Sequence, residues 1–235
     1  VSSHLAEITL CKLAELMVPN NFSLLLSRIK DDLISKALEV HSMFAFLSGA
    51  FVNAIIPKLT ELKIKEKTPP HFCALKACPQ GHPFKHCLLP CVKDLRKKIN
   101  IKFRVLYKPE AKNFPLVGVF FFMESNPMTL VGLRMTTGDE HHTITSTMRQ
   151  FTECLAAYFS EWKELSQKIL WDIIYKQHTD SRPIKKWQKC DVDNIDNIND
   201  EEIKIEALWN GKVRQYQVSI SYGVFRRDET HRTEE

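Results

Sequence analysis

The sequence predicts an α+β fold in which N-terminal helices precede a three-stranded antiparallel meander, a long covering helix and a C-terminal β-hairpin. Apolar residues recur at helical spacing early in the chain and again after residue 145, and strand-like runs lie between these regions without strict βα alternation. The composition, with 44% hydrophobic and 26% charged residues and a mean hydropathy of -0.24, is typical of globular proteins. The 235 residues are enough for one large domain or two small ones.

Two helices are expected before residue 62. Ser2 and Ser3 can cap the first, whose apolar positions recur every three or four residues until Pro19 ends it. A second helical region covers about residues 23–62, and Pro57 should kink or end it. Residues 45–56 are apolar on nearly every side, which places them at the centre of the domain.

The predicted meander comprises residues 99–107, 116–123 and 128–136. The connections between these runs are short enough for antiparallel neighbours. The first run alternates apolar and basic residues, so one of its faces should meet water. The second run is apolar on both faces, as expected for a central strand covered from both sides.

The last third of the chain is expected to form a covering helix and a hairpin. A stripe of apolar residues predicts one helix over about residues 145–176. Residues 179–200 follow as a polar linker. The pair Asn210-Gly211 favours a type I′ turn, which predicts a hairpin between residues 203–209 and 213–225. The domains are therefore expected to be 1–178, with a Cys/His-rich loop at 69–91, the linker 179–200, and a hairpin and charged tail at 201–235 that join the same sheet.

A cluster of thiols and imidazoles within the Cys/His-rich loop is the densest chemistry in the chain. Zinc takes four such ligands, and short loops supply them in pairs a few residues apart. The best set is Cys73, Cys78, His82 and Cys87, with His86 and Cys91 as alternatives. The competing interpretation is a proline-rich loop whose cysteines pack as small apolar residues. No acidic residue lies between Glu66 and Asp94, which argues against a catalytic metal in this loop.

Two basic segments are candidates for binding surfaces. A stripe within residues 93–108 can neutralise phosphates, and its strongest positions are Arg96, Lys97, Lys98, Lys102 and Arg104. Phe103 and Tyr107 could stack on bases there. The plainer interpretation is a solvated face that protects a sheet edge. A second basic segment, residues 182–189, contains Trp187. Together with Trp171 and Tyr175 on the predicted covering helix, Trp187 is expected to contact partner proteins.

Net charge and targeting signals indicate the compartment and the kind of partner to expect. The net charge of +5 favours acidic partners. No secretory leader pattern opens the chain and the seven cysteines are odd in number, so reduced thiols in a nuclear or cytosolic protein are expected. The most apolar stretch is shorter than the ~20 residues that a membrane helix needs. The chain does not begin with Met, which suggests a fragment of a longer protein.

Taken together, these features predict a non-catalytic interaction module within a larger nuclear or cytosolic, chromosome-associated assembly. Its partners would be other protein subunits, with DNA or RNA as a second ligand and no membrane. We expect no cofactor, with structural zinc as the exception to test. The alternative is a zinc-dependent enzyme acting on nucleic acid or protein, with Glu140, His141 or His142 as acid or base.

Overall fold

A seven-stranded mixed sheet forms the centre of the protein. The structure is a computed structural model, and it describes residues 43–63, 71–136, 142–179, 181–193 and 200–220 together with positions 13, 138 and 140. The strand order is β1-β9-β7-β5-β4-β3-β2. These strands are β1 (Thr60–Leu62), β2 (Lys85–Leu89), β3 (Val105–Pro109), β4 (Val119–Met123), β5 (Thr129–Met135), β7 (Leu170–His178) and β9 (Val213–Ile220).

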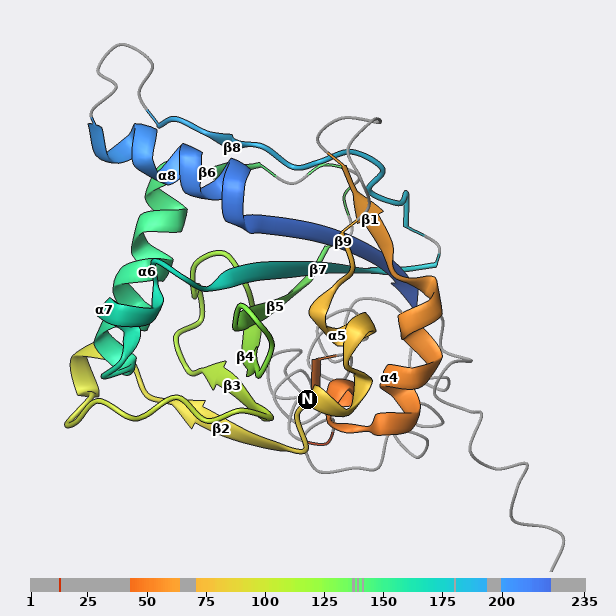
Figure 1. The fold of residues 1–235 in the computed structure, drawn as a ribbon, viewed down its shortest axis with the longest axis horizontal. Helices are drawn as coiled ribbons and strands as arrows, with labels where there is room; N and C mark the ends of the chain where they lie inside the picture. Colours follow the sequence, from red (N-terminus) through yellow and green to blue (C-terminus); the bar gives the residue numbers. More distant parts are fainter. Residues whose placement is uncertain are drawn as a thin grey trace, which may run out of the picture.

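The sheet combines an antiparallel part with a parallel part. Strands β3, β4 and β5 are antiparallel neighbours, whereas β5, β7 and β9 run parallel to one another. Strand β2 pairs in parallel with β3 at one edge, and β1 pairs antiparallel with β9 at the other. A separate two-stranded sheet pairs β6 (Thr143–Ile144) with β8 (Cys190–Asp191). β1 and β2 therefore lie at opposite edges of the main sheet (Figure 1).

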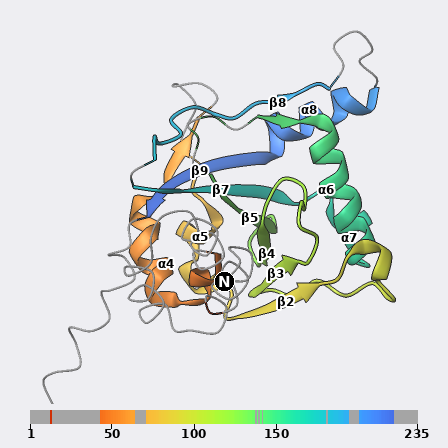
Figure 2. The same cartoon turned by 180° about the vertical axis from the view of Figure 1, so that it is seen from behind.

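Helices cover both faces of the sheet. One side carries α6 (Thr145–Tyr158), α7 (Trp162–Leu165) and α8 (Asp200–Lys212). The other side carries α4 (Gly49–Ile55) and α5 (Ala74–Ala77). Figures 1 and 2 show α6 and α7 on one side of the strands and α4 and α5 on the other. Short 3-10 turns complete the described part at η1 (Ala45–Leu47), η2 (Ile56–Lys58), η3 (Pro79–Gly81) and η4 (Val92–Asp94).

Aromatic rings fill the core between the sheet and α6. Phe120 lies at the centre of this core, with its ring centroid 5.5 Å from that of Tyr107 and 5.9 Å from that of Phe151. Phe122 and Phe159 pack edge to face at 5.2 Å. Offset and edge-to-face contacts of this kind add to the free energy gained by burying the rings. The alternation along β4 sends Phe120 and Phe122 into this core and Val119, Phe121 and Met123 into the opposite one.

The opposite core joins the sheet to α4 and α5. It contains Phe51 and Ile55 from α4 and Leu75 from α5, all buried against Phe121 and neighbouring strand residues. Gly132 on β5 is required by close packing on the aromatic-core side of the sheet, because a Cβ at this position would lie 2.6 Å from a methyl carbon of Val117. Both faces of the central strands are thus buried away from solvent.

The predicted architecture is wrong in its extent and in its last third, although the class remains roughly α+β. Strands β3, β4 and β5 do form an antiparallel run, but four further strands extend it into a mixed sheet. One of these, β2, lies inside the Cys/His-rich segment that was expected to be a loop. Apart from position 13, the first predicted helix lies outside the described residues, and so does the first half of the second, residues 23–42. In its described half, α4 ends at Ile55, two residues before Pro57, and Thr60–Leu62 form strand β1 in place of the predicted helix.

The single long helix over residues 145–176 is not formed. Helix α6 ends at Tyr158, the short helix α7 follows, and residues Leu170–His178 form the central strand β7. Trp171, Ile173 and Tyr175 face the aromatic core, while Ile174 faces the other one. A strand buried on both faces is apolar at most positions, so its spacing also fits a helical stripe. The β-branched and aromatic residues of this segment favour the strand.

The C-terminal hairpin is also wrong. Residues Asp200–Lys212 form helix α8, and Asn210 and Gly211 lie in its last turn instead of in a type I′ turn. Three acidic residues in the first turn stabilise the helix through its dipole. Strand β9 then pairs with β7 in parallel, a geometry that requires a crossover and excludes a hairpin.

Phe120→Ala should destabilise the protein more than any exposed aromatic substitution. Removing the central ring opens a cavity among five aromatic neighbours, which costs about 3–5 kcal/mol of unfolding free energy. Phe72→Ala is the matched control because Phe72 is 66% exposed. Chemical denaturation of both variants measures the difference; equal midpoints would contradict this packing.

Candidate nucleic-acid interface and the polar network of the sheet

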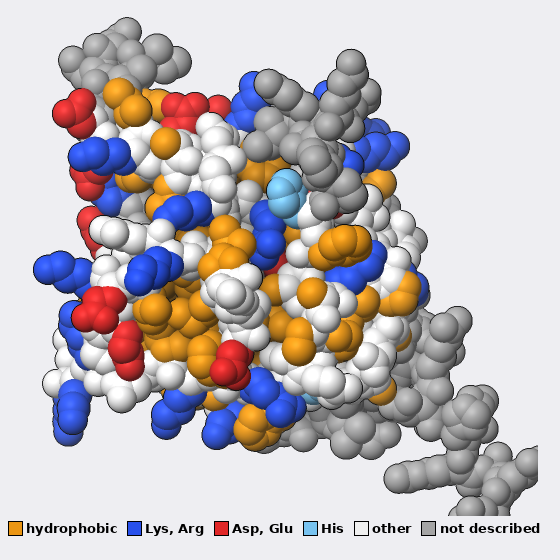
Figure 3. All heavy atoms as spheres, viewed as in Figure 1, with side chains coloured by type: hydrophobic (Ala, Val, Ile, Leu, Met, Phe, Trp, Pro, Cys, Tyr) orange, Lys and Arg blue, Asp and Glu red, His pale blue; other side chains and the backbone are white. Residues whose placement is uncertain are grey.

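The predicted basic stripe lies on the surface at the β2 edge of the sheet. Arg96, Lys97, Lys98, Lys102 and Arg104 are all exposed, in the connection that returns from the end of β2 to the start of β3. Backbone contacts attach this connection to α6, because the Ile99 N–H donates to the Tyr158 carbonyl at 2.8 Å. Figure 3 shows Lys and Arg side chains along the lower border of the molecule, where Figure 1 places β2.

Exposed aromatic rings accompany these cations. Phe84 is 56% exposed and Phe103 39% exposed. The Arg104 guanidinium carbon lies 5.0 Å and the Lys85 Nζ 5.2 Å from the centroid of the Phe84 ring. Sequence spacing did not single out Phe84 or Lys85, because they lie outside the basic stripe and precede its first residue, Lys93, by nine and eight residues. Tyr107, by contrast, is buried in the aromatic core.

Backbone contacts hold this cluster in place. Arg104 has a φ of 59°, in the left-handed region that non-glycine residues rarely adopt. Its carbonyl accepts from the Phe84 N–H at 3.1 Å, and its Nε donates to the His82 carbonyl at 3.3 Å. We call Phe84, Lys85, Arg96, Lys97, Lys98, Lys102, Phe103 and Arg104 the basic edge.

The predicted zinc ligands occupy different environments. Cys73 is buried beneath the sheet, Cys78 is exposed, and Cys87 lies on the edge strand β2. His82 places its Nδ1 2.8 Å from the Pro83 carbonyl. Of the alternatives, His86 packs edge to face on Phe44, and Cys91 precedes η4. Among the described residues, no three His, Cys, Asp or Glu side chains are grouped so that they could hold a metal ion. The zinc site stays a prediction.

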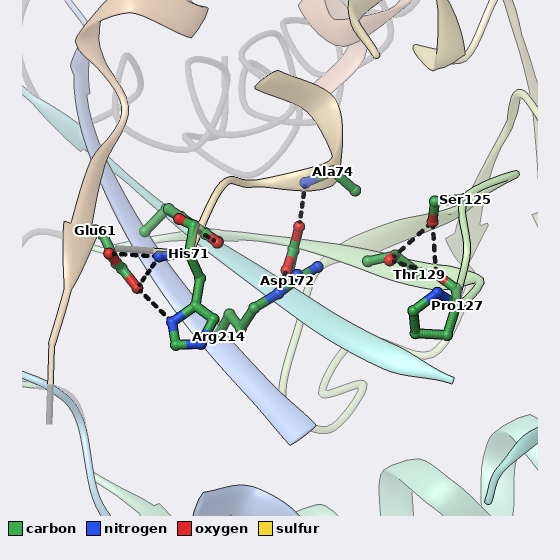
Figure 4. A network of polar contacts seen from close by, with 9 residues as sticks. Glu61, His71, Ala74, Ser125, Pro127, Thr129, Asp172 and Arg214 are labelled. Carbon is green, nitrogen blue, oxygen red and sulfur yellow. Dashed lines mark hydrogen bonds and ion pairs between the residues drawn. The ribbon is translucent and has the colours of Figure 1, made fainter. Parts of the chain in front are cut away.

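A buried carboxylate connects the start of the Cys/His-rich segment to the sheet. Asp172 on β7 is fully buried and accepts hydrogen bonds from the Ala74 N–H at 2.7 Å and from the Arg214 Nε at 2.6 Å. Nearby, Glu61 on β1 accepts hydrogen bonds from the His71 N–H at 3.1 Å and also lies beside the His71 ring. Figure 4 shows these contacts joining β1, β7, β9 and the segment leading into α5.

Burial controls ionisation in this network. Burial raises the pKa of the Asp172 carboxyl, and this effect exceeds the opposite influence of Arg214 and the Ala74 N–H. The pKa of the Cys73 thiol is raised well above its usual value by burial and by the neighbouring Asp172 charge. Cys73 therefore remains a neutral thiol at neutral pH, which gives it low reactivity as a nucleophile.

Buried glutamines hold the segment predicted to be a polar linker. Gln177 on β7 accepts from the Ile184 N–H at 2.7 Å and donates to the Arg182 carbonyl at 2.8 Å. Gln215 on β9 exchanges two hydrogen bonds with the Gln188 backbone, at 2.9 and 2.8 Å. The Trp209 indole N–H also donates to the Gln188 carbonyl, at 3.0 Å. Residues 182–190 are thus held on the sheet as a fixed segment, which we call the clamped loop.

The three residues expected to contact partner proteins are placed differently from one another. Trp171 is 0% and Tyr175 1% exposed, so both rings belong to the aromatic core and offer no surface. Their predicted contact role depended on a helix that does not form. Trp187 lies in the clamped loop, half-buried against the core, and it also lines a surface cavity. Of the residues named as acid or base for the enzyme alternative, Glu140 is exposed and His141 lies outside the described residues. The His142 Nδ1 is 3.6 Å from an Asp191 carboxylate oxygen.

Comparisons with known proteins found no matching family model, no matching curated protein and no matching solved structure. Within the part of the chain that the structure describes, no helix combines the length and apolar character needed to cross a membrane.

Arg214→Met should destabilise the protein in a pH-dependent way. Without the guanidinium, Asp172 is a buried carboxyl with no cation beside it, at a cost of roughly 3 kcal/mol at neutral pH. Its pKa, already raised in the folded state, should rise further. The folded state then binds a proton more readily than the unfolded state, so stability is highest below the unfolded pKa and falls as pH rises through the folded pKa.

Urea titrations of the Arg214→Met variant from acidic to alkaline pH measure this loss. Arg149→Met is the control, because Arg149 pairs at 3.5 Å with Glu201, which is 64% exposed, and such surface pairs contribute little. A constant difference from the unmodified protein at every pH would contradict the assignment of Asp172.

Gln177→Ala should release the clamped loop. The substitution leaves the Ile184 N–H and the Arg182 carbonyl without their partner, which costs about 1–3 kcal/mol. Quenching of tryptophan fluorescence by iodide should increase as Trp187 becomes more accessible. Gln150→Ala, on the exposed face of α6, is the control. An unchanged quenching constant would show that Gln177 does not position the loop.

Proposed function

We propose that this chain is a non-catalytic interaction module of a larger nuclear or cytosolic assembly, and that its basic edge contacts single-stranded nucleic acid. The observation that supports this proposal is the pairing of exposed rings with cations: Phe84 and Phe103 are surface aromatics, and Lys85 and Arg104 lie against the Phe84 ring. Proteins that bind single strands combine a positive surface for the backbone with rings on which bases stack.

The charge of the basic edge favours a polyanion. Arg96, Lys97, Lys98 and Lys102 make no ion pair or side-chain hydrogen bond with another described residue. Their ammonium and guanidinium groups are therefore available to replace the counterions that phosphates release on binding. Exposed rings favour an unpaired strand over a duplex, because the bases of a duplex are already stacked on one another.

The position of the surface also fits an interaction module. Among the described strands, β2 is the last of the main sheet at this edge, and Leu88 (46% exposed) and Val92 (41% exposed) lie close to the basic residues in sequence. Isolated exposed apolar residues are ordinary, but several together beside an open strand edge are common at interaction surfaces. Partner subunits are therefore proposed to approach the same side of the sheet.

Charge reversal of Lys97, Lys98 and Lys102 to Glu should weaken binding to a labelled oligo-dT strand and flatten its salt dependence. Each phosphate contact that is lost should reduce the slope of log K against log salt by roughly 0.7. Fluorescence anisotropy over a range of salt concentrations measures the slope. The matched control reverses three exposed lysines elsewhere: Lys163 on α7, Lys168 in the segment after α7, and Lys204 on α8. An unchanged slope and affinity would refute the proposal.

Substitution of the rings separates stacking from charge. Phe84→Ala together with Phe103→Ala should weaken binding by about 1–3 kcal/mol per stacked base and leave the salt slope nearly constant. A duplex of the same sequence should bind more weakly than the single strand, and its affinity should respond less to the ring substitutions. Equal effects on both forms of DNA would contradict a stacking role for these rings.

A further inference from the structure

A second basic surface lies at the opposite edge of the sheet from the basic edge. Along the clamped loop, burial alternates with exposure: Ile184, Gln188 and Cys190 face the protein, whereas Lys185, Lys186 and Lys189 face solvent. The loop lies beside β9 and β1, and the basic edge lies beside β2. Six inter-strand spacings separate these edges, or about 29 Å across the sheet. The two surfaces are distinct sites.

A cavity of about 850 Å³ opens between the clamped loop, β1 and α8. Its volume lies in the range of small-molecule sites. The basic residues of its lining are Lys63, Lys185, Lys186 and Lys189, and Trp187 and Asn210 also line it. The side chains of Lys185, Lys186 and Lys189 make no ion pair or hydrogen bond with any residue that the structure describes.

Three carboxylates share the cavity, and two of them already have cationic or hydrogen-bonding neighbours. Glu61 accepts hydrogen bonds from the His71 N–H, and Asp191 lies 3.6 Å from His142. Glu206 on α8 is the third. Among the lining residues that the structure describes, four ammonium groups and three carboxylates leave one net positive charge. Because the lysines of the loop are consecutive or nearly so, the positive charge is concentrated on the loop wall.

The clamp gives this wall a fixed geometry before any ligand arrives. Gln177 and Gln215, both 0% exposed, bind the loop backbone through four hydrogen bonds of 2.7 to 2.9 Å. A ligand that binds a fixed loop does not have to order it, which lowers the entropic cost of binding. The half-buried Trp187 ring is supported by the core on one side and lines the cavity.

We propose that this cavity binds a nucleotide, with its phosphates on Lys185, Lys186 and Lys189 and its base against Trp187. Lysine ammonium groups are point charges suited to phosphate, and an indole ring offers an aromatic face on which a base can stack. The Asn210 side chain can both donate to and accept from the edge of a base. This site does not depend on the function proposed for the basic edge.

Tryptophan fluorescence reports on this cavity selectively. The chain has four tryptophans, and Trp162, Trp171 and Trp209 are 3%, 0% and 0% exposed. Titration with ATP should therefore quench mainly Trp187, and calorimetry on the same samples should give one binding site per chain. Inorganic tripolyphosphate should bind more weakly and quench little, because it lacks a base.

Three variants test the assignment of groups. Reversal of Lys185, Lys186 and Lys189 to Glu should weaken ATP binding at least about tenfold, and Trp187→Phe should abolish the quenching while keeping most of the affinity. Reversal of Lys163, Lys168 and Lys204, or of Lys97, Lys98 and Lys102 on the basic edge, should leave ATP binding unchanged. Circular dichroism confirms that each variant is folded.

The proposal is overturned by no calorimetric binding of ATP at millimolar concentration, or by equal affinity in the variant with the loop charges reversed. Binding of an oligonucleotide at the loop without binding of ATP would also overturn it, because the cavity would then recognise a strand. Loss of oligonucleotide binding in the basic-edge variant, with ATP binding intact, supports two separate sites.

Discussion

Polar side chains buried on two neighbouring parallel strands determine where the surface segments lie. Asp172 and Gln177 on β7, and Gln215 on β9, are each 0% exposed, and a buried polar group without a partner is costly. Their partners are backbone groups of connecting segments: Asp172 binds the Ala74 N–H on one face, and the two glutamines bind the clamped loop on the other. The core therefore fixes the loops as well as the helices.

The same requirement explains why the clamped loop can carry so much positive charge. Lys185, Lys186 and Lys189 repel one another when they are held close together, and a flexible segment would move them apart. The hydrogen bonds of Gln177 and Gln215 to the loop backbone keep the backbone positions of these lysines together. A fixed and repelling set of cations gains more from an incoming anion than a flexible set does, because no loop ordering accompanies binding.

The sequence predicted local character better than it predicted topology. The apolar run at residues 116–123 was expected to be a central strand covered on both faces, and β4 is buried on both faces. The run at 170–178 has similar character, but its three- and four-residue spacings also fit a helix, so the spacing of apolar residues alone did not distinguish strand from helix.

Helix α8 is mostly polar, and its buried residues are Glu202 and Trp209. In its sequence Ile203 and Ile205 alternate with charged residues, which is the pattern of a strand. Acidic residues at its start favour the helix, but the sequence prediction rested on the Asn-Gly pair alone.

The candidate surfaces show the same difference between local character, which the sequence reveals, and long-range topology, which it does not. Exposed charges at residues 96–104 could be found from composition because a run of cations stays on the surface in almost any fold. Phe84 and Lys85 could not, since they meet Arg104 only through the parallel pairing of β2 with β3. The glutamines of β7 and β9 are ordinary polar residues in sequence, and only the sheet shows that they face a loop. Long-range pairing of strands thus brings residues that are scattered in sequence into one site. In this chain it places two cationic surfaces at opposite edges of one sheet. A single extended anion can reach both surfaces only by spanning about 29 Å across the sheet.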